Sequence, residues 1–213
     1  MKLRLVSRVL VPVLVVVIGG LLLVYQHNAG HQSTPPRATA LALKGADLGA
    51  TPAPNFTLAD SSGATVSLAS LRGHPVVLTF LYTHCPDQCP LTAEKLHAAA
   101  QALGTQGAAQ VRWVVVSVDP AGDTPTSANA FLAAHHLNGT AQYLLGTQAQ
   151  LAPVWDAYHV AVQPDGDAQA MVNGVSHTVG VFVLDAQGRE RAYLDGTFDP
   201  AELAYDLRAL GAS

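Results

Sequence analysis

Two apolar runs rich in β-branched residues constrain the fold of this chain more than any other feature. Residues 76–82 read VVLTFLY, and residues 111–118 read VRWVVVSV. Neither run alternates between apolar and polar positions, so each predicts a strand buried on both faces. Such strands occur in parallel sheets whose two faces are covered by helices. The chain is therefore expected to fold as an α/β protein.

Helix signals separate and follow these strands. Residues 91–104 predict a helix that ends at Gly104, and Thr124 with Pro125 predicts the start of another. Asp199-Pro200-Ala201-Glu202 is a capping box that opens a last helix. The other expected elements are a hairpin (56–58 and 66–68), a strand (143–145), a helix (148–158), a polar loop (163–176) and a second hairpin (178–184 and 189–194). The order predicts a largely parallel central sheet with an antiparallel addition.

Composition excludes several classes of protein. Only 12% of the 213 residues are charged and the formal net charge is −4, so the chain lacks the basic surface of a nucleic-acid-binding protein. Its two cysteines are too few for a scaffold of several disulfides. Because they are close in sequence, they indicate a redox pair or a metal site. A small structural disulfide loop is the alternative, but so short a loop constrains little of the unfolded chain.

The N-terminus carries an apolar run behind a basic flank. At about 1.5 Å per residue, the run is near the lower limit for crossing a bilayer. The flank favours a cytoplasmic N-terminus. The expected order is a cytoplasmic flank (1–8), an uncleaved single-pass transmembrane anchor (9–25), a linker (26–50) and a folded domain (51–213). A cleaved secretory signal is the alternative, and both interpretations put the domain outside the cytoplasm.

The two cysteines lie directly after the first buried strand, in the sequence YTHCPDQCP. Proline after each cysteine disfavours a regular helix through both. The segment therefore predicts a loop that delivers Cys89 to the N-terminus of the next helix. There the helix dipole and free N–H groups favour a thiolate, which both metal binding and disulfide exchange require.

Two soft thiolates select Cu(I), zinc or an iron–sulfur cluster. A cluster normally needs four cysteines and a structural zinc site needs four ligands, whereas Cu(I) accepts fewer soft ligands. A third ligand is expected to be one of the nine histidines. His177 stands out because it ends the polar loop and precedes an apolar run. The alternatives are His84 at a strand end, His97 on a helix, His135 and His136 at a helix end, His74, His159, and the linker residues His27 and His31.

Three segments resemble the signatures of one family in the same order. FLYTHCPDQCPLT, VSVDPAGDTP and VSHTVGVFVLDAQGR are similar to those of the Sco/SenC family, over residues 51–213. The resemblance implies a thioredoxin-like fold with a central mixed sheet flanked by helices. It also implies a copper ion bound by Cys85, Cys89 and His177. In the second signature, Asp119 and Asp123 are interpreted as turn and cap residues.

The resemblance implies a copper metallochaperone, a binding protein rather than an enzyme. It would deliver copper to, or maintain the thiols of, the binuclear copper centre of a haem–copper oxidase, and receive copper from a periplasmic donor. We expect it in the inner membrane with its domain on the periplasmic side. The alternative is a thiol–disulfide oxidoreductase that uses Cys85 and Cys89 without copper, although its dedicated motif has two intervening residues rather than three. A peroxiredoxin-like peroxidase is disfavoured because Tyr82 stands where that family has Thr or Ser.

Overall fold

The computed structural model describes part of the chain in detail: residues 17–21, 23, 42–164, 175–177 and 179–212. The chain divides into two compact units, Met1–Leu41 and Ala42–Ser213. Most of the expected flank, anchor and linker lie outside the described residues. Within the described ranges, the structure contains no helix that is both long enough and apolar enough to cross a membrane.

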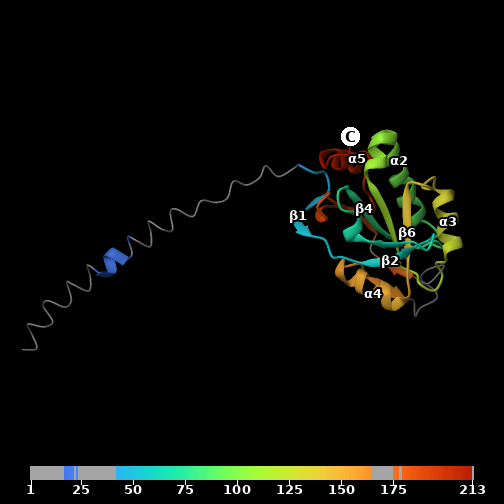
Figure 1. The fold of residues 1–213 in the computed structure, drawn as a ribbon, viewed down its shortest axis with the longest axis horizontal. Helices are drawn as coiled ribbons and strands as arrows, with labels where there is room; N and C mark the ends of the chain where they lie inside the picture. The colour runs from blue at the N-terminus through green and yellow to red at the C-terminus, as the bar shows by residue number, and fades with distance from the viewer. Residues whose placement is uncertain (1–16, 22, 24–41, 165–174, 178, 213) are drawn as a thin grey trace, which may run out of the picture. The chain divides into compact units, whose positions relative to one another are not determined.

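A mixed sheet forms the centre of the second unit (Figure 1). In the described part of this unit its eight strands have the order β1 (Ala46–Pro52), β10 (Arg189–Asp195), β9 (Gly180–Leu184), β4 (Val76–Leu81), β5 (Arg112–Ser117), β6 (Ala141–Leu145), β2 (Thr57–Asp60) and β3 (Thr65–Ser67). The β4–β5 and β5–β6 pairs are parallel, and the pairs outside them are antiparallel. The predicted central mixed sheet is confirmed.

Helices cover both faces of this sheet. They are η1 (Leu68–Leu71), α2 (Gln88–Gln110), α3 (Pro125–Ala134), α4 (Gln148–Ala157) and α5 (Pro200–Ala209). Figure 1 shows α2 and α5 on one side and α4 on the opposite side. Every residue of β4 is buried, as are all residues of β5 after Arg112. The prediction that the two uninterrupted apolar runs form strands buried on both faces is therefore confirmed.

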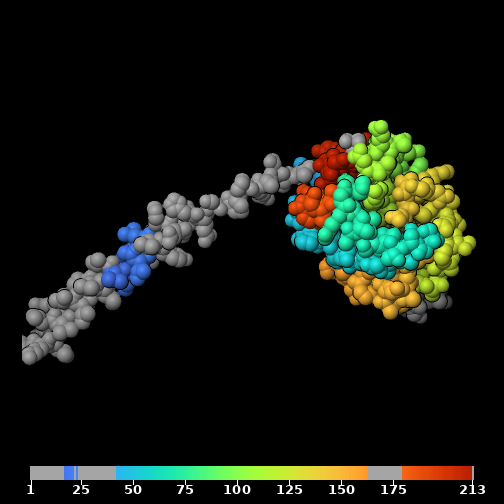
Figure 2. Space-filling view, in the orientation of Figure 1, coloured from blue at the N-terminus to red at the C-terminus, as the bar shows by residue number. Residues whose placement is uncertain are grey.

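The predicted helix starts are also confirmed. The Thr124 side chain accepts a hydrogen bond from the Ser127 N–H, and Pro125 is the first residue of α3. At the start of α5, Asp199 accepts from the Ala201 N–H. On the face shown in Figure 2, the β2–β3 region (teal) lies beside α4 (orange), and Leu58 and Val66 of this hairpin are buried.

Three boundaries differ from the sequence prediction. The strand β1 falls partly within the expected linker, because its backbone pairs with β10 and extends the sheet. The expected polar loop begins and ends in a two-stranded sheet of β7 (Val162–Pro164) and β8 (Val175–His177). The helix that was expected to end at Gly104 is interrupted there, because Gly104 has non-helical dihedral angles (φ 74°, ψ 170°), but a second helical segment of α2 follows and reaches Gln110.

Candidate metal centre

The loop after β4 presents the two cysteines at the beginning of α2. The Cys85 N–H donates to the Tyr82 carbonyl at 3.4 Å, which turns the chain after the strand. Asp87 is the N-cap of α2, and its carboxylate accepts from the Gln88 N–H at 2.5 Å. Cys89 is the second residue of the helix. The prediction that the loop delivers Cys89 to a helix N-terminus is confirmed.

Both cysteines are free thiols in very different surroundings. Cys89 is completely buried, whereas Cys85 is half-buried and reachable from solvent. The Cys89 N–H points at the Cys85 sulfur, with 3.3 Å between nitrogen and sulfur. The site therefore holds one accessible and one inaccessible sulfur donor side by side.

These surroundings move the two thiol pKa values in opposite directions. The Cys89 thiol donates a hydrogen bond to the Cys85 sulfur, and with the Cys89 N–H it lowers the Cys85 pKa to about 5. The same hydrogen bond, together with burial, raises the pKa of Cys89 well above that of a free thiol. At neutral pH the pair therefore carries one thiolate, on Cys85, and one proton, on Cys89. The expectation that the helix N-terminus favours a thiolate at Cys89 is wrong for the metal-free protein, because burial and the hydrogen bond to Cys85 keep the Cys89 proton in place.

We expect the metal-free, reduced protein to be alkylated at Cys85 with a pH–rate midpoint near 5, because only the thiolate reacts. Rates of carbamidomethylation by iodoacetamide between pH 4 and 9 measure this midpoint. In Cys89→Ala, which removes the hydrogen bond to the sulfur, the midpoint should move upward. A wild-type midpoint near that of an ordinary thiol, about 8.5, would contradict the geometry.

A buried carboxylate fixes the start of the cysteine loop. The side chain of Asp123 accepts the Thr83 N–H at 2.8 Å and the Thr83 hydroxyl at 2.7 Å. It also accepts the Ser117 hydroxyl at 2.6 Å and the Tyr143 hydroxyl at 3.0 Å. Asp123 thus ties the residues after β4 to β5 and β6. The predicted turn role holds for Asp119, which accepts from the Gly122 N–H, but the cap is Thr124 and Asp123 is a buried acceptor instead.

One carboxylate–histidine group close to the cysteines resembles a metal site by distance alone. Ligand atoms of His84, Asp119 and Asp123 lie within 4.8 Å of one another. Each Asp123 oxygen already accepts two hydrogen bonds, which uses its lone pairs. His84 Nδ1 lies 3.1 Å from the Thr83 hydroxyl, whose own proton goes to Asp123. The group is better explained as a hydrogen-bond network that holds the loop.

His177 is the last residue of β8, and its backbone pairs with Val162. In the next strand, Val181 pairs with Thr79 of β4, and the two strands run antiparallel. The chain just before β9 therefore reaches the end of the sheet at which β4 leads into the cysteine loop. This topology is compatible with a third ligand there, and ligation by His177 stays a prediction.

Known proteins are similar to this chain in sequence. The family model described as SCO1/SenC matches residues 45–212. The bovine mitochondrial protein SCO2 homolog is 30% identical over 140 residues, which are 63% of this chain and 50% of that protein. Protein SenC of Rhodobacter capsulatus is 31% identical over 134 residues, 61% of this chain and 57% of that protein. The match thus spans about half the length of these relatives.

The fold of this chain is also similar to the folds of solved protein structures. The structure of Bradyrhizobium japonicum ScoI with copper bound is 30% identical, with a TM-score of 0.65 over 75% of this chain and 99% of that one. The apo Sco1 protein of Thermus thermophilus is 26% identical, with a TM-score of 0.66 over 78% of this chain and 95% of that one. These likenesses bear out the expected thioredoxin-like fold. The family match covers far more than half of the sequence, and the chain therefore belongs to the SCO1/SenC family.

Proposed function

We propose that this chain is a copper(I)-binding metallochaperone whose metal ligands are Cys85, Cys89 and His177. The observation that carries the proposal is the thiol pair at the start of α2, in which one sulfur is already ionised at neutral pH. Soft thiolates select Cu(I), and binding requires a deprotonated sulfur. The copper-bound relative from Bradyrhizobium japonicum supports the choice of metal.

The different exposure of the two sulfurs suits a protein that passes its metal on. Half-buried Cys85 gives an incoming donor or acceptor thiolate access to the metal, whereas buried Cys89 retains it. The partner's thiolates can then replace the metal ligands of this chain one at a time, in the way that thiol–disulfide exchange proceeds through a mixed intermediate. A closed site with every donor buried would hold the ion but release it slowly.

The cellular role that we propose is delivery of copper to the binuclear copper centre of a haem–copper oxidase, or maintenance of that centre's thiols. The partners are the subunit that carries this centre and a periplasmic copper donor. The apolar run at 9–25 and its basic flank support an inner-membrane anchor with the domain on the periplasmic side. In cells that lack the protein, oxidase activity and oxidase copper content should fall, and the wild-type gene should restore both. Unchanged oxidase copper would contradict this role.

The metal site is tested by titrating the reduced chain with Cu(I) against a competing chelator. We expect one equivalent to bind tightly and the affinity to fall at least about tenfold, or about 1.4 kcal/mol, in His177→Ala. The control is His159→Ala, which removes an exposed histidine that precedes β7 and leaves the three proposed ligands in place. Unchanged affinity in His177→Ala would contradict the three-ligand site.

A thiol–disulfide oxidoreductase is the second candidate, and the lowered Cys85 pKa favours it. An accessible thiolate beside a buried thiol is the arrangement of an attacking and a resolving cysteine. This activity needs no histidine ligand. Disulfide reduction that persists in His177→Ala, combined with weak copper binding in the wild type, would favour this function over the chaperone.

A further inference from the structure

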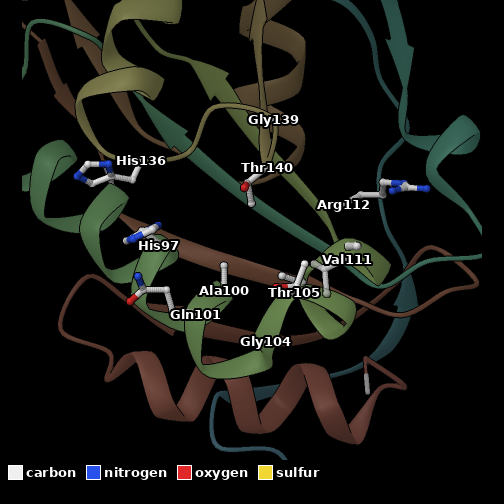
Figure 3. Close-up of a pocket in the computed structure, with 12 residues that line it drawn as sticks. His97, Ala100, Gln101, Gly104, Thr105, Val111, Arg112, His136, Gly139 and Thr140 are labelled. Carbon is white, nitrogen blue, oxygen red and sulfur yellow. The ribbon is translucent and has the colours of Figure 1, made fainter.

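A groove of about 840 Å³ lies between α2 and the turn that follows α3 (Figure 3). Its walls include His97 and Gln101 of α2, and His136 and Thr140 of the turn. The residues that line it include none from the cysteine loop 82–89. The groove is therefore separate from the candidate metal centre.

Two histidine rings face each other at one end of this groove (Figure 3). The centroids of the His97 and His136 rings are 5.3 Å apart, with 42° between the ring planes. His97 is half-buried and His136 is exposed. Neither imidazole ring makes a hydrogen bond to another described residue. The ring nitrogens are therefore available to a ligand.

The backbone at His136 is unusual for a residue with a side chain. It has a φ of 57°, in the left-handed region, just after the end of α3. The neighbouring Leu137 N–H donates to the Leu132 carbonyl at 2.8 Å. This hydrogen bond is typical of a helix end at which the left-handed residue, here His136, is usually a glycine. A left-handed conformation is unfavourable for a residue that has a Cβ atom. Here it directs an imidazole to the groove.

We propose that His97 and His136 form a second metal site, for a divalent first-row cation that prefers imidazole. Two imidazoles that share an ion at about 2.1 Å from each nitrogen have ring centroids roughly 5 to 6 Å apart, which is the observed spacing. The exposed His136 ring can turn a nitrogen towards the ion without moving the backbone. Gln101, one turn after His97 on the same helix, lies at the same end of the groove and adds an oxygen donor, and water completes the shell (Figure 3).

Among the described residues, the one arginine that lines the groove is directed away from the histidine pair. The Arg112 side chain lies at the other end of the groove and points away from the histidines (Figure 3). Its guanidinium donates to His74 Nε2 at 2.9 Å. The groove lining contains no sulfur, so the site selects Cu(II), Ni(II) or Zn(II) rather than Cu(I), with Cu(II) bound most tightly.

The test uses Cu(II) alone and a form of the whole chain that lacks the first site. In Cys85→Ser/Cys89→Ser/His177→Ala, no thiol remains to reduce the ion, and the result does not depend on the proposed Cu(I) function. We expect this form to bind one Cu(II) in the groove, with nitrogen hyperfine structure in its electron paramagnetic resonance spectrum. Adding His97→Ala or His136→Ala should lower the affinity at least tenfold and reduce the number of coupled nitrogens by one.

His135→Ala is the matched control. His135 is the residue before His136, but its ring packs on Phe131, with centroids 4.6 Å apart, and does not border the groove. Its removal should leave the affinity within about twofold. His136→Asn, which keeps a residue tolerant of the left-handed backbone, guards against loss of binding through misfolding and should lower the affinity as much as His136→Ala. Affinity unchanged in His97→Ala/His136→Ala, or lowered equally in His135→Ala, would overturn the proposal.

Discussion

Replacing Asp123 by leucine is expected to lower the free energy of unfolding by about 3–5 kcal/mol. The carboxylate is only 8% exposed and accepts hydrogen bonds from Thr83, Ser117 and Tyr143. Leucine accepts none, and each buried donor left without a partner costs about 1–3 kcal/mol, partly recovered where a hydroxyl can rotate. Denaturant unfolding of the reduced, metal-free chain, followed by tryptophan fluorescence, measures the change.

Asp119→Asn is the control for this prediction. Asp119 lies in the same loop and is partly exposed, and its carboxylate accepts the Gly122 N–H, a bond that the asparagine oxygen can keep. Its cost should stay below about 1 kcal/mol. The loss of unfolding free energy in Asp123→Asn should lie between those of Asp119→Asn and Asp123→Leu, since one acceptor oxygen remains. A cost below about 1 kcal/mol for Asp123→Leu would show that the network does not hold the loop.

The parts of the fold that could be predicted are those with a local cause. The apolar runs of β4 and β5 reflect burial on both faces, and the proline-containing starts of α3 and α5 reflect capping chemistry. In contrast, β1 has the sequence ADLGATP, which has little strand propensity. It becomes a strand because β10 offers an edge to pair with, and no local pattern records that edge.

The candidate site shows the same division. The prolines after Cys85 and Cys89 were enough to predict a loop that leads into a helix. The opposite pKa shifts of the two thiols were not predictable, since they depend on which sulfur is buried and which receives the hydrogen bond. The role of Asp123 was missed because its partners Ser117 and Tyr143 come from separate strands. Likewise, His97 and His136 meet because the turn after α3 lies across the groove from α2.

Cu(I) affinity is expected to fall at least about a thousandfold in both Cys85→Ser and Cys89→Ser. A serine hydroxyl is a hard donor that stays protonated, so each change removes one of the two soft thiolates that select Cu(I). The loss should be similar in the two variants, because Cu(I) needs both sulfurs although only one is accessible. A competition titration with a Cu(I) chelator measures it, and Gln88→Ala, which changes an exposed side chain beside Cys89, should keep wild-type affinity.

Attack on a disulfide should separate the same two variants. Cys89→Ser keeps the accessible Cys85 sulfur and leaves no resolving thiol, so it should accumulate a mixed disulfide with a small disulfide probe. Cys85→Ser keeps only a completely buried thiol with a raised pKa and should react at least a hundredfold more slowly. Equal loss of copper binding with unequal thiol reactivity is thus the pattern that this geometry requires. Copper binding retained within tenfold by either variant would contradict a site built on both sulfurs.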